Sequence, residues 1–299
     1  MSNRCPTTRA KSRVVAIALA MGAGAAAPGG SQADSHALQR MVATERAFAA
    51  ATAELGVRDG FLAFFEPAAV QIEAGMSGRE TRLVRAVDAL RARPLPPLPL
   101  GAALIWNPHT GQIASDGSLG WLTGPFVVMD HAAAAVVGQG AYFSVWKRQA
   151  DGAYRVWLDE GVSLPEAWQG ASEFIAAASP SGGEGGAAGE PVESAERAIA
   201  AGGAPWRARW SRSVRLHREG AAPVAGAAAA ATWADGAWTA VAFSLVRAVV
   251  AGSDDLGIAV GGYDATTPGG VEHGTWVRVW RRDVEGRWRI VFETNKAAR

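Results

Sequence analysis

The chain has one cysteine, Cys5, among its 299 residues. Cys5 precedes an apolar segment at residues 14–27 that is typical of an export signal. The chain beyond that segment therefore has no thiol. This excludes disulfides, a thiol nucleophile and cysteine metal sites.

Closely spaced histidines are missing as well. The five histidines form no His-x-His or His-x-x-x-His pair. A metal site needs several ligands that converge on one point. We therefore expect neither a metal site nor a cofactor.

The chain also lacks an excess of either charge. Lysine and arginine total 29, aspartate and glutamate total 28, and the net charge is +1. This balance supplies no overall field that would attract nucleic acid. Residues 206–218 interleave tryptophan with arginine, a pattern that could bind an anion or a nucleic acid strand. The alternative is a strand whose arginine stems pack along its own fold. We expect the second arrangement and no nucleic acid partner.

What the sequence does contain begins with a basic and then apolar N-terminal segment. The apolar run at residues 14–27 is shorter than the stretch of about 20 residues that a membrane anchor needs. Small residues follow it at positions 31–33. This order predicts a signal peptide over residues 1–33 and a mature start near Asp34. It also predicts export to the periplasm, with no membrane contact after cleavage.

Apolar spacing indicates how the rest of the chain folds. Hydrophobic residues make up 49% of the chain, enough for a packed core. The spacing predicts a helix over residues 35–56, with Met41 and Phe48 on its packed stripe and Glu45 off that stripe. Strand patterns follow, and an Asp-Gly pair at 151–152 between alternating apolar runs predicts a hairpin. Helices followed by antiparallel strands favour an α+β fold.

One pattern occurs twice. Residues 140–161 read GAYFSVWKRQADGAYRVWLDEG, and residues 274–295 read GTWVRVWRRDVEGRWRIVFETN. A Gly/Ser-rich stretch at residues 179–191, which has no large apolar side chains to bury, separates the two halves. A repeat this long indicates a duplicated domain, since solenoid repeats are about 20–50 residues. We expect a first domain over 34–175, a linker over 176–191 and a second, smaller domain over 192–299.

The hairpin motifs resemble a known family. G-x-Y-F-x-V-W-K-R and G-x-W-V-x-V-W-R-R, preceded by LGWLTGP and LGIAVGG, resemble the nuclear-transport-factor-2-like superfamily. The branch is one of exported bacterial proteins of unknown function, related to SnoaL-type polyketide cyclases and ketosteroid isomerases. The resemblance implies two tandem cone-shaped domains, each a curved antiparallel sheet wrapped around N-terminal helices, with a pocket inside. Members commonly pair sheet to sheet, which implies that the two copies pair within one chain.

The resemblance does not bring the isomerase mechanism with it. That mechanism needs a carboxylate base, which the family places on its first strand. The corresponding position is assigned to Ile72 and, in the second copy, to Leu216. Neither side chain can move a proton, so we expect no isomerase activity of this type.

Alternation along the two hairpins separates their faces. It places Tyr142 and Trp146 on one face of the first hairpin, and Trp276, Arg278 and Trp280 on one face of the second. Because this face mixes rings with arginines, we expect it to meet the other domain, with arginines stacked on tryptophans.

The first domain keeps the fuller set of helices, and we expect the pocket there. Trp106 and Trp121 lie on strands that precede the hairpin, where they could line the cone or simply pack its core. The candidate ligand-binding residues are Glu45, Glu73, Trp106, Asp116, Trp121 and Tyr142.

Three functions remain open. The one we favour is a non-catalytic module that binds a small apolar or aromatic ligand in the first cone. The second is an isomerase or lyase that uses a pocket carboxylate such as Glu45, Glu73 or Asp116. The third is a structural or interaction protein with a filled cone. A buried pocket carboxylate of raised pKa would favour the enzyme.

Overall fold

The computed structural model describes residues 32–92, 102–168, 173–182, 186–202 and 205–298. The predicted signal peptide lies outside these residues up to position 31, so cleavage and export stay predictions. No helix within the described ranges combines the length and apolar character that crossing a bilayer requires.

The first domain places helices and a short hairpin before a long antiparallel meander. The elements, in chain order, are α1 (Gln32–Leu55), α2 (Val57–Phe64), β1 (Phe65–Glu73), η1 (Gly78–Glu80), β2 (Arg82–Arg85), α3 (Ala86–Ala92), β3 (Ala102–Trp106), β4 (Thr110–Ile113), β5 (Leu119–Asp130), β6 (Ala135–Arg148), β7 (Tyr154–Ser163) and β8 (Ile175–Ala176). The strands form an eight-stranded sheet in the order β2-β1-β7-β6-β5-β4-β8, with β3 also paired to β5.

The second domain repeats this order with smaller helices. Its elements are α4 (Val192–Ala200), η2 (Trp206–Arg209), β9 (Trp210–Arg218), β10 (Ala221–Ala225), α5 (Ala227–Ala237), β11 (Ala240–Val250), β12 (Leu256–Thr267), β13 (Gly270–Arg282) and β14 (Trp288–Ala297). The six-stranded sheet runs β10-β9-β14-β13-β12-β11. The protein is therefore α+β, with two tandem domains that each wrap a curved sheet around helices.

The two sheets match in detail. In both, the last long strand (β7 or β14) pairs in parallel with the first long strand of its domain (β1 or β9). The register of the closing hairpin shifts at the same place, between Val145 and Trp146 in one copy and between Val279 and Trp280 in the other. Positive φ angles at Gly152 and Gly286 allow the two hairpin turns. Because the two closing hairpins share their register and the position of the shift, each residue of one hairpin can be matched to one residue of the other.

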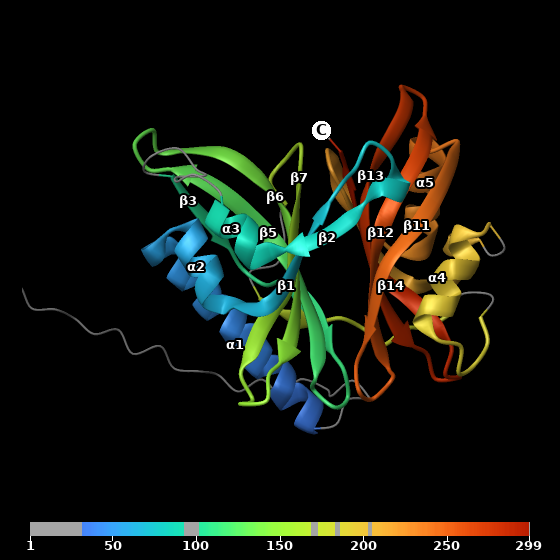
Figure 1. The fold of residues 1–299 in the computed structure, drawn as a ribbon, viewed down its shortest axis with the longest axis horizontal. Coiled ribbons are helices and arrows are strands. Elements are labelled where there is room, and N and C mark those ends of the chain that lie inside the picture. The colour runs from blue at the N-terminus through green and yellow to red at the C-terminus, as the bar shows by residue number, and fades with distance from the viewer. Residues whose placement is uncertain (1–31, 93–101, 169–172, 183–185, 203–204, 299) are drawn as a thin grey trace, which may run out of the picture.

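Helices lie on the outer side of each sheet, and the two sheets face one another in the middle of the molecule (Figure 1). One buried cluster takes side chains from both sheets. At its centre the rings of Phe143 and Phe292 stack with centroids 4.7 Å apart, and Trp121 lies 5.2 Å from Phe292. A dry apolar layer between two sheets is a strongly stabilising arrangement.

The hairpin faces are the reverse of the sequence expectation. The valines and phenylalanines, among them Phe143 and Val277, meet the other domain. The tryptophan faces, with Trp146 and Trp280, point inward to the helices of their own domain. On the inner face, helical glutamates accept the indole N–H of Trp146 and of Trp280, whereas the aliphatic face needs no hydrogen-bond partner and packs on the other sheet.

A second contact joins the domains away from the apolar layer. Gly78, in the loop between β1 and β2, donates its backbone N–H to the Asp264 carboxylate at 2.8 Å and accepts from the Ser244 hydroxyl at 2.6 Å. A side chain at position 78 would collide with the backbone of Tyr263. Glycine therefore allows this loop to lie directly on the second sheet.

Phe292→Ala tests the contact between the sheets. Removing this fully buried ring leaves a cavity between Phe143 and Trp121, so the free energy of unfolding should fall by about 3–5 kcal/mol in denaturant titration of the full chain. Val284→Ala, in an exposed turn of the same hairpin, is the control and should change it by less than about 0.5 kcal/mol. Equal stability of the two variants would rule out the packed interface.

Candidate functional site

The candidate site lies in the first cone and is organised by one residue of α1. Glu45 follows Met41 by four residues and precedes Phe48 by three, so it lies on the buried stripe of the helix. All three side chains are fully buried. The sequence expectation that Glu45 leaves this stripe is therefore wrong.

The Glu45 carboxylate accepts three hydrogen bonds inside the cone. Its Oε1 accepts from Trp106 Nε1 at 2.6 Å. Its Oε2 accepts from Ser144 Oγ at 2.6 Å and from Trp146 Nε1 at 2.8 Å. Burial raises the pKa of Glu45, and the three hydrogen bonds oppose that rise. Glu45 is thus occupied as an acceptor that holds the strands on the helix, rather than free for a ligand.

The second domain has the same hydrogen bond from a hairpin tryptophan to a helical glutamate, and an arginine is added to it. Glu196 of α4 accepts from Trp280 Nε1 at 2.7 Å, as Glu45 does from Trp146. Glu196 also accepts from Arg278 at 2.8 Å, and Arg278 donates to Glu293 at 2.9 Å. A buried guanidinium between two carboxylates therefore fills the interior of the second cone.

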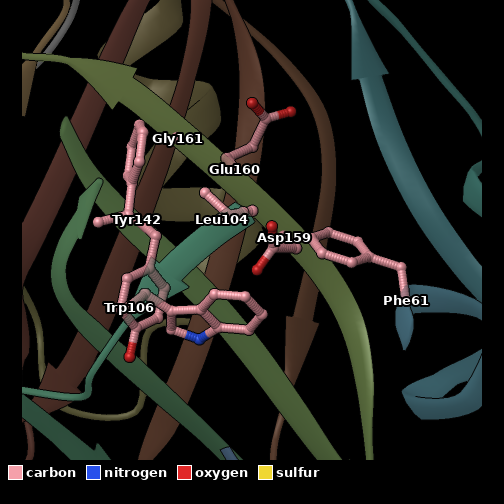
Figure 2. A pocket seen from close by; sticks show the side chains of 8 residues that line it. Phe61, Leu104, Trp106, Tyr142, Asp159, Glu160 and Gly161 are labelled. Carbon is pink, nitrogen blue, oxygen red and sulfur yellow. The ribbon is translucent and has the colours of Figure 1, made fainter. Parts of the chain in front are cut away.

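The first cone instead contains a cavity of about 160 Å³. Its walls are mainly rings and a leucine from α2, β3, β5 and β6, closed on one side by β7 (Figure 2). We call it the cone cavity, and its lining residues are Phe61, Leu104, Trp106, Phe126, Tyr142, Asp159, Glu160 and Gly161.

Two polar groups lie at the border of this apolar space. The Tyr142 hydroxyl is buried and has no hydrogen-bond partner among the described residues. The Asp159 carboxylate projects from β7 between Trp106 and Phe61 (Figure 2), and no described group donates a hydrogen bond to it. Burial, together with the charges of Glu45 and Glu160, raises the pKa of Asp159 well above its usual value. Burial also raises the pKa of Tyr142.

The cone cavity adjoins a more polar space between the domains. A neighbouring cavity of about 190 Å³ shares Phe61, Asp159, Glu160 and Gly161 with it. There the Lys296 ammonium of β14 pairs with the Glu160 carboxylate at 2.9 Å. The second domain thus contributes a cation next to the cone cavity, but this cation is already paired with Glu160.

Of the six candidates from the sequence, Trp106 and Tyr142 line the cone cavity, and Glu45 supports its floor. Trp121 lies on the other face of β5, in the cluster between the sheets, so the expectation that it could line the cone is wrong. The face is fixed by alternation: Trp121 is cross-strand from Val145, which also points to the second sheet.

The other two candidate carboxylates lie away from the cone cavity. Glu73, at the end of β1, forms an ion pair with Arg82 at 2.8 Å. Asp116 is exposed in the turn before β5 and accepts from the Ser118 backbone and hydroxyl at 2.9 and 2.7 Å. Burial opposes the shift, but hydrogen bonds from Ser118 and Ser253 lower the pKa of Asp116.

Ile72, the position assigned to the family's base, packs in the cluster between the sheets and also lines the cavity next to the cone cavity, as its neighbour Gln71 does. Neither an aliphatic side chain nor an amide can serve as a general base, so the argument against that mechanism is unchanged.

Asp159 is the functional candidate that sequence reasoning missed. The signal was available in the doubled hairpin: Asp159 occupies the place of Glu293, and Ser144 the place of Arg278. Glu293 thus lies opposite an arginine that pairs with it, whereas Asp159 lies opposite a serine that donates to Glu45 instead.

Arginines of the stretch at 206–218 form ion pairs with nearby carboxylates. Arg207, Arg209 and Arg218 pair with Asp235, Glu190 and Glu272. No group of three histidine, cysteine, aspartate or glutamate side chains is arranged to hold a metal ion within the described part of the chain.

No protein-family model matches the chain. No curated protein matches it either. The solved structures that it resembles are nuclear-transport-factor-2-like and ketosteroid-isomerase-like proteins, the superfamily that the hairpin motifs resemble.

Three of these structures illustrate the likeness. A ketosteroid isomerase homologue from Parabacteroides distasonis is 16% identical to this chain, with a TM-score of 0.29. The matched region covers 39% of this chain and 95% of that protein. A Shewanella oneidensis protein of unknown function is 13% identical over 35% of this chain and 88% of its own, with a TM-score of 0.26. A Mycobacterium tuberculosis protein in complex with estradiol-17β-hemisuccinate is 17% identical over 34% of this chain and 87% of its own, with a TM-score of 0.26.

Glu45→Leu tests the acceptor role of Glu45. The Trp106 indole loses its only acceptor among the described residues, and each unsatisfied buried donor costs about 1–3 kcal/mol, so the free energy of unfolding should fall by about 2 kcal/mol or more. Glu54→Leu, on the exposed side of the same helix, is the control. Urea unfolding followed by tryptophan fluorescence measures both, and an unchanged midpoint in Glu45→Leu would contradict the assigned role.

Proposed function

We propose that this protein is an exported, non-catalytic binding module that holds a small ligand with an apolar or aromatic body in the cone cavity. The observation that carries the proposal is an apolar space bordered by two polar groups, the Tyr142 hydroxyl, which has no partner among the described residues, and the Asp159 carboxylate. Ligand sites are typically apolar pockets in which a few placed polar groups fix the orientation of the ligand.

The volume of the cone cavity sets the size of the ligand. A cavity of about 150 Å³ lined by apolar side chains binds benzene, and the cone cavity is about 160 Å³. One aromatic ring with a short substituent therefore fits, and a larger body would extend into the neighbouring cavity past Asp159.

The second domain serves as the partner of the first in this proposal. Its interior is filled by Arg278 and the rings around it, and its sheet backs the strands that enclose the cone cavity. We propose that the two domains stay paired in solution within one chain, which would keep β6 and β7 in the curvature that the cone cavity needs.

Leu104→Trp tests binding in the cone cavity. The larger side chain should fill the space and weaken the binding of small aromatics, such as phenol and indole, by about tenfold or more in calorimetric titration. Ile105→Trp is the matched control, because Ile105 is the exposed neighbour on the same strand and should bind as the wild type does. If no small aromatic or lipid binds the wild-type chain, the binding function is wrong.

A second candidate function is favoured by one specific observation, the raised pKa of Asp159 inside the cone cavity. A carboxylate of raised pKa is a competent general base near neutral pH. An isomerase or lyase would use it to take a proton from carbon, with the Tyr142 hydroxyl donating to the developing oxyanion.

Deuterium exchange into a small cyclic ketone such as cyclopentanone tests this second candidate. If Asp159 acts as the base, the wild-type chain should accelerate exchange at the α-carbon, and Asp159→Asn should lower that rate by about 100-fold or more. Glu73→Gln should leave it unchanged, because Glu73 lies outside the cone cavity. No exchange above the rate in buffer would leave binding as the function.

A further inference from the structure

The second cone contains a complete binding site for a cation, and the chain itself supplies the cation. The Arg278 guanidinium pairs with Glu196 and Glu293 at 2.8 and 2.9 Å. It also lies over the Phe243 ring at 4.1 Å and the Trp276 ring at 4.4 Å. Two carboxylates and two aromatic faces thus enclose one planar cation.

The matched register identifies the residues of the first cone at these positions. Ser144 is cross-strand from Asp159, as Arg278 is from Glu293. Tyr142 is cross-strand from Gly124, as Trp276 is from Gly261.

The remaining two partners also have counterparts. Trp106 is cross-strand from Phe126, two residues after Gly124, and Phe243 is cross-strand from Tyr263, two residues after Gly261. Glu45 accepts the hairpin indole N–H in the first cone as Glu196 does in the second. All four partners of the guanidinium are therefore matched in the first cone, and only the guanidinium is replaced, by a serine.

The space in the first cone lies where those matched residues are. Trp106, Tyr142 and Asp159, the counterparts of Phe243, Trp276 and Glu293, all line the cone cavity. Glu45 lies beneath it, bonded to Trp106. The charges that face Asp159 are those of Glu45, Glu160 and Lys296, and Lys296 is paired with Glu160. The inner end of the cone cavity is thus anionic and has aromatic walls.

The geometry points to a small organic cation as the ligand of the cone cavity: a guanidinium, amidinium or ammonium group on an aromatic or apolar body. The inference rests on the proposed binding function and names the chemical class of its ligand. The cation pairs with the Asp159 carboxylate, lies against the rings of Trp106 and Tyr142, and donates a hydrogen bond to the Tyr142 oxygen. It takes the place that Arg278 occupies in the second cone.

Three probes of the same shape test the charge. Benzamidinium, benzamide and benzoate share a ring and a planar head but are cationic, neutral and anionic. In calorimetric titration of the full chain, benzamidinium should bind at least about tenfold more tightly than benzamide, and benzoate should bind most weakly.

Two carboxylates of the first domain give the matched variants. Asp159→Asn should remove the preference for benzamidinium while benzamide still binds. Glu73→Gln, whose carboxylate pairs with Arg82 outside the cone cavity, should keep the preference. Ser144→Arg would supply an internal guanidinium, as in the second cone, and should abolish benzamidinium binding.

Proton linkage gives an independent readout. The cation pairs with ionised Asp159, and burial raises the pKa of Asp159, so affinity for benzamidinium should increase as the pH rises through that pKa. Affinity for benzamide should change little, because its binding needs no ionised carboxylate.

The outcomes separate this inference from the binding function. Benzamide bound as tightly as benzamidinium, or an equal loss of preference in Glu73→Gln, would overturn the cationic ligand and leave the binding module in place. Binding of phenol or indole without benzamidinium would overturn it too. If no probe of any charge binds, the binding function and the inference both fail.

Discussion

The inner face of each closing hairpin is joined to a helix by a hydrogen bond to a buried glutamate. In each domain a hairpin tryptophan points inward, and a helical glutamate accepts its hydrogen bond at 2.7–2.8 Å. Losing such an acceptor costs about 1–3 kcal/mol, so this bond ties the orientation of the hairpin faces to the helix. Once the tryptophan face is turned inward, the aliphatic face is left outward. The two aliphatic faces then bury each other, which gives the apolar layer between the sheets.

The interiors of the two cones differ in the groups that pair with their buried carboxylates. A buried carboxylate that accepts a tryptophan N–H still carries a charge to be compensated. The second cone compensates Glu196 and Glu293 with Arg278 and thereby fills its own interior. The first cone has Ser144 at that position, so Glu45 is satisfied by neutral donors alone and Asp159 has no donor among the described residues. One difference, serine for arginine, therefore accompanies both the cone cavity and its unpaired carboxylate.

Pairing of the two sheets also affects the site. Ser144 and Asp159 point into the cone, while their neighbours Phe143 and Glu160 point to the second domain, where they meet Phe292 and Lys296. Strands β6 and β7, which line the cone cavity, are thus contacted from behind by the second domain. The second domain can in this way support the cone cavity of the first.

The sequence by itself determined the α+β class, the duplication, the closing hairpins and the resemblance to nuclear-transport-factor-2-like proteins, because alternation and turn residues are local signals. It also identified Trp106, Tyr142 and Glu45, although with Glu45 on the wrong side of its helix. The tertiary structure alone decided which face of each hairpin is buried inside its domain. The physical reason is that the acceptor of the Trp146 indole lies 101 residues away in the chain, on a helix whose contact with the sheet no local pattern specifies. That contact places Trp121 between the sheets and Asp159 in the cone cavity, and so decides which carboxylate is free to meet a ligand.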